Sequence, residues 1–226
     1  ADYNDSLVTR LGSSLREYAA RVDSVAGVSV VSAEKRIAVE QEVQLHCQLR
    51  GSWFHSVSEA RGVQNSYASP ASLGADRWAA LIAARGLAPQ GACIMDVGTA
   101  LTVDGLDERG KHLGGAIFPG ADALLSALGS STAQIDFARG GEVPAIPAAS
   151  TREGVLGGVF HGFNYVANGL SAEIASICPE GSAMFVTGGG ACGVLPFLSR
   201  DDWQYREHMV IEGVARLVRG VDCPSP

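Results

Sequence analysis

The chain has 226 residues, of which 46% are hydrophobic and 18% are charged, and its formal net charge is −7. This length is enough for one large or two small domains with a buried core. The acidic balance argues against an extended nucleic-acid surface, which needs clustered Lys and Arg. No apolar run approaches the roughly 18–20 residues of a membrane span. We therefore expect a globular protein that binds neither nucleic acid nor membrane.

Five cysteines are scattered along the chain without a CxxC pair, and the five histidines show no ligand spacing such as HxxxH. An odd and dispersed set of cysteines argues against a disulfide framework and against a zinc site. We expect the protein to reside in the reducing cytoplasm.

The N-terminal part alternates between helical and extended patterns. Apolar residues with a 4-4-3 spacing between residues 7 and 18 predict one face of a helix. Residues 27–32 and 53–57 predict short strands, and residues 36–49 predict a second helix. This rhythm is typical of an α/β layer.

The next segment, residues 62–86, begins with turn formers and continues into a helix for which Ser72 is a candidate cap. Asp76 and Arg77 fall in the first turn. Asp76 is either an acid that favours a helix N-terminus, by about 0.3–1 kcal/mol, or a general base toward a hydroxyl. Arg77 either pairs with a carboxylate or holds an anionic group. Tyr67 in the preceding loop is either a packing ring or a wall of a substrate pocket.

Residues 92–120 carry the clearest strand pattern. An apolar run ends at Asp96, Gly98 and Thr99 form a bend, and apolar and polar residues then alternate as far as a turn at 107–110. The pattern predicts consecutive antiparallel strands. Gly98 lets backbone N–H groups approach an anion, Thr99 can donate a hydrogen bond, and Asp96 can hold a cation that offsets phosphate charge. The bend is therefore a candidate phosphate cradle.

A short helix is predicted from Gly120, followed by a mobile connection over residues 140–149. Ser150 and Glu153 have the S-x-x-E form of a capping box, so a long helix is expected to begin there and to end before Pro179. Helix initiation alone would account for Thr151.

Three successive glycines at 188–190 follow an apolar strand predicted at 183–186. Each glycine adds conformational entropy that folding must overcome, which favours close approach of the backbone to a flat or phosphorylated ligand. A tight strand–helix turn is the alternative interpretation. Residues 203–208 are expected to be irregular, and residues 209–218 predict a last amphipathic helix.

Together these motifs resemble the type III pantothenate kinases, which belong with the acetate and sugar kinases and the actin-like ATPases. The resemblance includes the branch of the Bordetella accessory factor described as a transcriptional activator. The segments that carry it keep the family's order and spacing: NSY at 65–67, GADRW at 74–78, DVGTALTVD at 96–104, HLGGAIFPG at 112–120, the helix start at 151–154 and TGGGA at 187–191.

The resemblance implies an α/β fold with two RNase H-like domains of the actin-like ATPase type, each a mixed sheet flanked by helices. We place these domains at 1–90 and 91–226. ATP would lie in the cleft between them and pantothenate near a homodimer interface. The implied activity is ATP-dependent phosphorylation of pantothenate to 4'-phosphopantothenate, the first step of coenzyme A biosynthesis.

Site residues follow from the resemblance by position. Asp76 resembles the base that activates the pantothenate hydroxyl, and Asp96 resembles the site of a monovalent cation, K⁺ or NH₄⁺, while Mg²⁺ accompanies ATP. Substrate contacts are implied for Tyr67, Gly74, Ala75, Asp76, Arg77 and Thr151. ATP contacts are implied for Gly98, Thr99, Gly188, Gly189 and Gly190.

One feature of the family has no counterpart here, namely an opening strand with an acid–x–Gly–Asn–Thr/Ser phosphate loop. We expect this N-terminal hairpin of the first domain to be missing because the sequence is incomplete at its start; a natural truncation is the alternative. Two rival functions stay open at this point. One is a kinase-fold regulator or binding protein with impaired catalysis, and the other is a related kinase with a different small-molecule acceptor.

Overall fold

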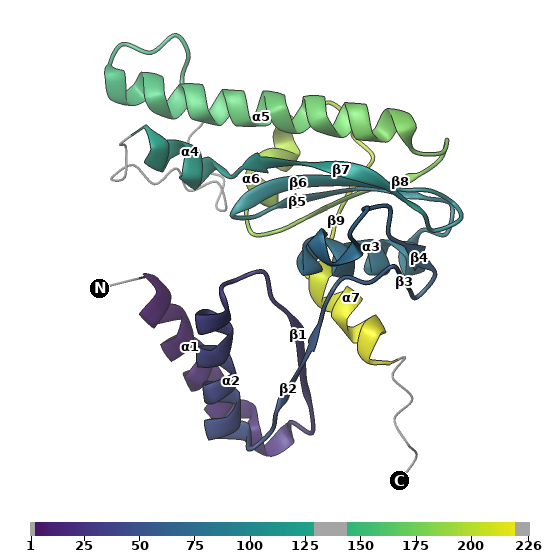
Figure 1. Ribbon diagram of the computed structural model, residues 1–226. Coiled ribbons are helices and arrows are strands. Elements are labelled where there is room, and N and C mark those ends of the chain that lie inside the picture. The colour runs from purple at the N-terminus through teal and green to yellow at the C-terminus, as the bar shows by residue number, and fades with distance from the viewer. Residues whose placement is uncertain (1–2, 129–143, 220–226) are drawn as a thin grey trace.

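The computed structural model describes residues 3–128 and 144–219 (Figure 1). These residues form a mixed five-stranded sheet covered by helices on both faces, together with a smaller α/β unit built from the N-terminal elements. The expected α/β class, with a mixed sheet flanked by helices, is therefore confirmed. None of the described helices combines the length and the apolar character needed to cross a membrane.

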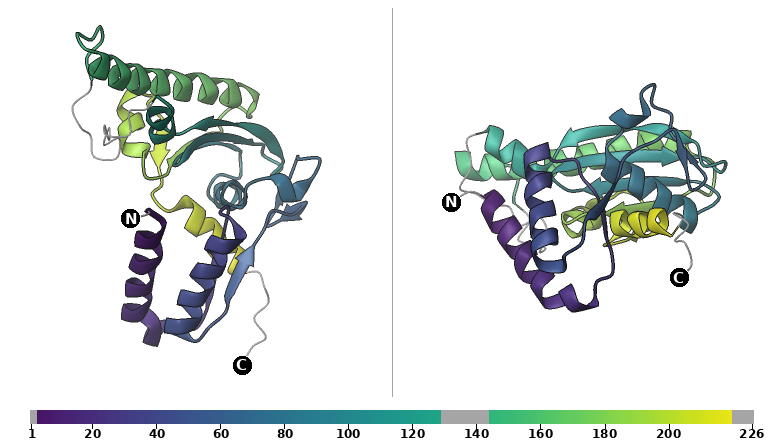
Figure 2. Two further views of the ribbon diagram at one scale, coloured as in Figure 1. Left: turned by 60° about the vertical axis from the view of Figure 1, so that its left-hand side comes forward. Right: turned by 60° about the horizontal axis from the view of Figure 1, so that its bottom comes forward.

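The N-terminal unit pairs two helices with two parallel strands, β1 and β2. It lies on the side of α3 and α7, away from α5, in both sets of views (Figures 1 and 2). Its elements are α1 (Tyr3–Tyr18), a 3-10 turn (Ala19–Arg21), β1 (Val25–Val28), α2 (Ala33–Cys47) and β2 (Gly51–Phe54).

Both strands of this unit end earlier than the apolar pattern predicts. The last register pair joins Val28 to Phe54, whereas Val30 and Val31 are exposed. An apolar run extends a strand only as far as a neighbouring strand accompanies it, and β2 ends at Phe54. The prediction of a strand over 27–32 was therefore wrong at its C-terminal end.

A hairpin and a short turn lead from this unit to the main sheet. They comprise β3 (Glu59–Ala60), β4 (Val63–Gln64), a 3-10 turn (Pro70–Ser72) and then α3 (Ala75–Leu87). The expected cap Ser72 was wrong, because Gly74 is the N-cap and makes no side-chain capping bond. The Ser72 hydroxyl instead donates to the Ser69 carbonyl at 2.7 Å, a local bond that competes with capping.

The main sheet has the order β7-β6-β5-β8-β9. The three strands of residues 92–119 are antiparallel neighbours as predicted, while β8 and β9 run parallel to β5. The strands are β5 (Ala92–Val97), β6 (Ala100–Leu106), β7 (His112–Pro119), β8 (Ala183–Thr187) and β9 (Trp203–Tyr205). β9 corrects the expectation of an irregular segment at 203–208. Its residues Trp203 and Tyr205 have high β propensity, and pairing with β8 holds this three-residue stretch as an edge strand.

Helices cover the two faces of the sheet differently. The long α5 (Thr151–Ile177) lies across one face with α4 (Ala121–Ala127) and α6 (Ala191–Val194), and α3 packs with α7 (Met209–Val218) on the other (Figure 1). The predicted capping box is confirmed, since the Ser150 hydroxyl oxygen accepts from the Glu153 backbone N–H. Part of the predicted connection, residues 140–143, lies outside the described residues.

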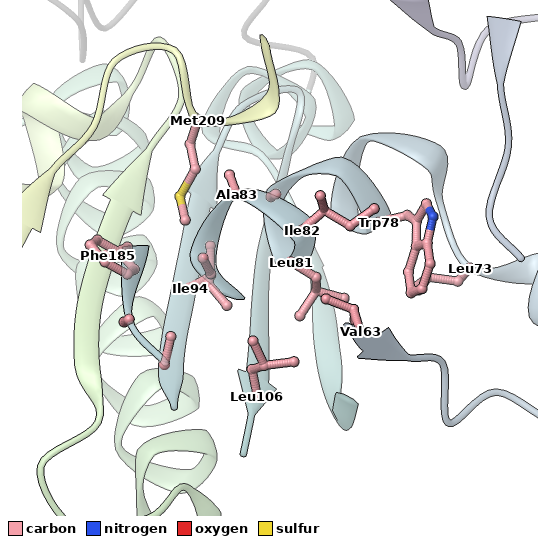
Figure 3. Packing of buried hydrophobic residues seen from close by; sticks show 14 of the residues in the cluster. Val63, Leu73, Trp78, Leu81, Ile82, Ala83, Ile94, Leu106, Phe185 and Met209 are labelled. Carbon is pink, nitrogen blue, oxygen red and sulfur yellow. The ribbon is translucent and has the colours of Figure 1, made fainter. Parts of the chain in front are cut away.

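Successive side chains along β5 and β6 point to opposite faces of the sheet, and this divides the hydrophobic core into two clusters. Ile94 and Leu106 face α3 and α7, together with Trp78 and Leu81 of α3 (Figure 3), whereas Met95 and its alternate neighbours face α5. Side chains two residues apart on a strand share a face. Asp96 and Asp104 must therefore project to the α3 side, and this alternation positions the candidate site.

Candidate functional site

A buried ion pair joins α3 to the sheet. The Arg77 guanidinium donates from Nε to Asp104 Oδ2 at 2.8 Å and from Nη2 to Asp104 Oδ1 at 2.6 Å. Arg77 is 5% exposed and Asp104 is 3% exposed. The fork of Arg matches a carboxylate bidentately, which fixes orientation as well as charge. The sequence left two roles open for Arg77, and the structure shows the first of them, pairing with a carboxylate. That carboxylate, Asp104, is buried.

His112 on β7 extends this pair into a network. Its Nε2 lies 2.8 Å from Asp104 Oδ1 and its Nδ1 lies 3.3 Å from the Ser66 hydroxyl. A carboxylate only accepts hydrogen bonds, so Nε2 carries the proton and Nδ1 faces Ser66. Burial by itself would raise the pKa of Asp104, but hydrogen bonds from His112 and Arg77 lower that pKa below its ordinary value. Asp104 is therefore ionised and fully paired.

Arg77 stays charged in this setting. Burial opposes the charged guanidinium, but the hydrogen bonds and the charge of Asp104, followed by those of Tyr67, outweigh it and raise the pKa of Arg77. The remaining terminal nitrogen, Nη1, donates to the Tyr67 hydroxyl at 2.9 Å. Tyr67 also stacks on His112, with 5.8 Å between ring centroids. Tyr67 is therefore a packing ring that also accepts a hydrogen bond from Arg77, and a role as the wall of a substrate pocket stays a prediction.

The loop that carries Ser66 and Tyr67 is fixed by Asn65. The Asn65 amide donates to the carbonyls of Val57 and Pro70 at 3.2 and 3.0 Å, and its oxygen accepts from the Tyr67 backbone N–H at 3.0 Å. This is an Asx-type local turn that replaces regular secondary structure. The loop is thereby held against the buried network.

Asp76 lies in the first turn of α3, half-buried, next to Arg77. Its Oδ1 accepts from the Arg77 backbone N–H at 2.7 Å, and its Oδ2 has no hydrogen-bond partner among the described residues. A Cβ at Gly74 would stand 2.7 Å from Asp76 Oδ1, so a side chain there would displace the carboxylate. Glycine at position 74 thus leaves room for Oδ1 to accept this bond, which orients the carboxylate and leaves Oδ2 unbonded.

Asp96 is the penultimate residue of strand β5 and lies close enough to Asp76 for the Asp76 charge to affect its pKa. Burial, then the charges of Asp76 and Asp104, raise the pKa of Asp96 to about 6. The Asp96 carboxylate accepts no hydrogen bond in the part of the chain that the structure describes. A half-buried carboxylate without donors needs a counter-ion, and oxygen ligands suit hard cations.

The ends of β5 and β8 bring the two predicted phosphate-binding segments together. These strands are parallel neighbours, and Asp96 pairs with Thr187. Gly188 has φ +93°, and a Cβ there would collide with Asp96 Oδ1 and the Val97 carbonyl. The Gly190 N–H donates to the Val97 carbonyl at 2.8 Å. The tight-turn alternative thus explains Gly188 and Gly190 by packing alone.

Gly189 differs from its two neighbours, since a Cβ at this position would meet no atom within 4 Å. Gly98 and Thr99 are likewise exposed, in the bend that follows β5. Their carbonyls are crowded by Gly120, whose N–H donates to the Thr99 carbonyl at 3.1 Å. The Gly98 N–H donates to the Ala100 carbonyl at 2.9 Å, so the exposed N–H groups that an anion can approach are those of Thr99 and Gly189.

Thr151 lies apart from the other predicted substrate contacts. It begins α5, which covers the opposite face of the sheet from α3. There it lines an apolar groove of about 680 Å³ formed by α4, α5 and Phe118 of β7. Within one chain the structure gathers Tyr67, Asp76 and Arg77, but not Thr151.

Two central members of the network, Asp104 and His112, are absent from the sequence-based site. Both stand inside the motifs that carry the resemblance, DVGTALTVD and HLGGAIFPG, and a polar residue in an otherwise apolar strand was the available signal. Among the described residues, no three His, Cys, Asp or Glu side chains gather as ligands for a metal ion. The cation role predicted for Asp96 thus has no support from a cluster of protein ligands in these residues.

Comparison with known proteins gives a family match and close relatives. A family model described as type III pantothenate kinase matches residues 1–173. The type III pantothenate kinase of Halorhodospira halophila is 50% identical over 155 residues, which are 69% of this chain and 60% of that protein. The enzyme of Alkalilimnicola ehrlichii is 41% identical over 165 residues, or 73% of this chain and 66% of that protein. The chain thus spans less than two thirds of each relative.

One solved structure supports the fold independently. A protein from Campylobacter jejuni, titled as a Baf family transcriptional activator, superposes with a TM-score of 0.52 at 17% identity. The match covers 90% of this chain and 86% of that one. At this identity the likeness concerns the fold alone.

Proposed function

Because the chain belongs to the type III pantothenate kinase family, we propose that it takes part in ATP-dependent phosphorylation of pantothenate to 4'-phosphopantothenate, the first step of coenzyme A biosynthesis. The observation that carries the proposal is the meeting of Asp76 and Asp96 at the end of the central strand. One carboxylate has a free oxygen, and the other has a pKa raised by burial and by its neighbour. Phosphoryl transfer needs this kind of alignment and charge placement more than covalent help.

Asp76 is assigned as the general base. Its free Oδ2 would accept the proton of the primary hydroxyl of pantothenate as that oxygen attacks the γ-phosphate, a role that typically contributes 10²–10⁴-fold in rate. The Gly74-Ala75 turn supports this role by leaving room for the carboxylate. Arg77 is held by Asp104 and Tyr67, so its part in the substrate shell would be to fix Tyr67 and the first turn of α3 beside the substrate.

The strand edge is assigned to the nucleotide. The turns that contain Gly98, Thr99, Gly188, Gly189 and Gly190 would lie against the phosphates of ATP. The backbone N–H groups of Thr99 and Gly189, which are unpaired among the described residues, and the Thr99 hydroxyl would donate to them. Asp96 would hold K⁺ or NH₄⁺ beside this edge. When bound with ATP, Mg²⁺ supplies further charge neutralisation to the phosphates.

A homodimer would complete the substrate shell. Thr151 and Asp76 lie on opposite faces of the sheet in one chain, so Thr151 can join the same pocket only if it comes from a second copy. The apolar groove beside Thr151 supports a partner on this face. The dimer therefore follows from the substrate role assigned to Thr151.

The proposal also includes a two-domain architecture and a cytoplasmic location for the protein. We assign two RNase H-like domains, at 1–90 and 91–226, with the nucleotide between them. The parallel β1–β2 pair supports a separate first sheet. A reducing cytoplasm agrees with the free thiols of Cys47, Cys93, Cys178 and Cys192.

The test is steady-state kinetics of full-length Asp76→Asn with saturating ATP and pantothenate. We expect kcat to fall by at least about a hundredfold with the fold intact by circular dichroism. Asp122→Asn is the matched control, because Asp122 is an exposed acid in the first turn of α4. Its kcat should stay within about twofold of wild type, a change worth less than about 0.5 kcal/mol.

A loss smaller than about tenfold in Asp76→Asn, or about 1.4 kcal/mol, would contradict the assigned base. A panel of other small hydroxyl compounds tests the acceptor. If another acceptor had a higher kcat/KM than pantothenate, the assignment of pantothenate as the substrate would be wrong, but the assignment of the protein as a kinase would still hold. Absence of ATP turnover with every acceptor would favour a regulator that keeps the kinase fold.

A further inference from the structure

A second concave region lies at the C-terminal ends of α3 and α7. Gly86 of α3 belongs to it, and ten residues of helix place it about 15 Å along the axis from Asp76. Its volume is about 470 Å³, within the range of small-molecule sites. Its lining comes from α3, α7 and the β3–β4 turn: Arg61, Ile82, Gly86, Glu212, Ala215, Arg216 and Arg219.

The guanidinium groups of this pocket are uncommitted. The side chains of Arg61, Arg216 and Arg219 have no hydrogen-bond or ion-pair partner among the described residues. The carboxylate of Glu212 is already held by Arg206 at 2.8 and 3.0 Å. Three free positive charges therefore face a pocket whose one acid is neutralised.

A neighbouring arginine shows the contrast. Arg85, one residue before Gly86, donates to the carbonyls of Pro89 and Glu108 at 2.8 and 2.9 Å. Arg85 thus has a structural role in closing the adjacent loops. Within residues 3–128 and 144–219 the pocket arginines have no such bonds, so their position needs another explanation.

Gly86 makes room for one of these groups. A Cβ built on Gly86 would collide with the Arg216 guanidinium. Glycine inside a helix is unfavourable relative to alanine, and here its absent side chain lets Arg216 lie directly against α3. The Arg216 side chain is partly buried as a result, which limits its freedom and fixes its charge at the pocket.

Helix-terminal placement accounts for only part of this cluster. Arg216 and Arg219 lie at the end of α7, where cations complement the helix dipole. Arg61 does not belong to a helix: it occupies the β3–β4 turn with φ +53°, where Asn or Gly is usual. The chain carries a net charge of −7, but charges beyond about 8–10 Å are screened, so the local positive cluster decides what binds.

We propose that this pocket binds a compact polyanion that carries two or more phosphate groups. Each guanidinium offers a planar fork that matches a phosphate bidentately, and three forks around one concavity suit a pyrophosphate better than a single phosphate. The pocket is separate from the strand edge at Asp96, and the inference does not depend on the proposed kinase activity.

Calorimetric titration of full-length protein with inorganic pyrophosphate tests the site. Wild type should bind pyrophosphate at least about tenfold more tightly than orthophosphate, and Arg216→Gln should weaken pyrophosphate binding about tenfold, equal to about 1.4 kcal/mol. Arg109→Gln is the matched control, because Arg109 is a largely exposed arginine of the 107–110 turn. Its affinity should stay within about twofold of wild type.

Gly86→Ala provides a second variant that keeps every charge. The new methyl group would push the Arg216 guanidinium off α3, so pyrophosphate binding should weaken several-fold, whereas the melting temperature should not fall. Equal affinities of wild type and Arg216→Gln would overturn the proposal, because binding would then occur elsewhere, such as the strand edge. Absence of saturable binding to wild type would overturn it as well.

Discussion

Two carboxylates of the sheet, Asp96 and Asp104, project toward α3 from neighbouring strands but lie in opposite electrostatic settings. Asp104 receives three charge-assisted or polar hydrogen bonds, two from Arg77 and one from His112. Asp96 receives none among the described residues, and its pKa rises to about 6, whereas the pKa of Asp104 is lowered. Asp104 is thus committed to a structural network, whereas Asp96 has no donor in the described part of the chain and is the residue to which we assign the proposed cation.

Replacement of Asp104 tests the buried pair. Asp104→Asn keeps the size of the side chain but leaves the Arg77 charge buried without a counter-charge, so we expect a loss of about 3–5 kcal/mol in unfolding free energy. Urea denaturation would measure it. Asp202→Asn removes an exposed partner of Arg200 and should cost less than about 1 kcal/mol. Equal losses in both variants would show that the Arg77 pair adds nothing beyond a surface ion pair.

Replacement of Asp96 tests the raised pKa. An acid whose folded pKa lies near 6 and whose ordinary value is 3.8 contributes stability that is present below pH 4 and lost as pH rises through 6. Asp96→Asn should therefore raise the unfolding free energy at about pH 8 by roughly 1 kcal/mol, discounted for partial exposure.

The same variant should lose any potassium effect on stability. A cation that binds ionised Asp96 in the folded state raises the melting temperature of wild type as KCl replaces choline chloride. Thermal melts at constant ionic strength compare the two proteins. A wild-type melting temperature that is the same in both salts would refute the cation site, whatever the stability of Asp96→Asn.

At the scale of elements, the contact between α3 and α7 depends on small residues. A Cβ at Gly213 of α7 would collide with the backbone carbonyl of Ala79 in α3, and Ala79, Ala83 and Ala84 of α3 are fully buried. The two helices can approach closely only because neither carries bulk at the crossing. α3 in turn carries Asp76 and Arg77, so this packing positions the candidate base.

A substitution where α3 and α7 cross should change the free energy of unfolding in a predictable direction. Gly213→Ala should destabilise the protein by about 1–3 kcal/mol, because the added methyl group meets backbone rather than a movable side chain. Gly169→Ala in α5 is the matched control, since a Cβ there meets nothing within 4 Å, and it should be neutral or stabilise by up to about 1 kcal/mol. Chemical denaturation of both variants measures the difference. A neutral Gly213→Ala would mean that α7 can shift without cost.

At the scale of the whole molecule, the sheet separates the two parts of the proposed substrate shell. Asp76 stands on the α3 face and Thr151 on the α5 face. A twofold dimer in which each chain lends Thr151 to its partner would have two equivalent composite sites. This geometry makes a direct prediction for mixed dimers.

Subunit mixing provides the measurement. Full-length Asp76→Asn and Thr151→Val should each be nearly inactive alone, yet an equimolar mixture should regain about a quarter of wild-type activity, because half of the dimers have one intact composite site. Asp76→Asn mixed with Asp76→Ala is the control and should regain none. If the first mixture regains nothing beyond its parents, the two residues do not act in one site across chains.

The amino-acid sequence by itself determined most elements and the order of the site motifs. Period-two alternation identified the antiparallel strands of residues 92–119, and the capping box located the start of α5, because both signals are local. The position of Asp76 and Arg77 in the first turn of α3 was likewise predictable from the sequence. The residues at the strand edge were predicted from the same local cues of glycine, hydroxyl and acid.

Only the tertiary structure decided what these residues contact. Arg77 is committed to Asp104 and through it to His112, residues that lie 27 and 35 positions further along the chain, and no local pattern specifies a partner at such separation. The strand β9 exists because β8 offers it an edge. The Gly188 and Gly190 positions follow from contact with Asp96 and Val97. Pairing, burial and close approach are properties of the folded chain, so they became visible only there.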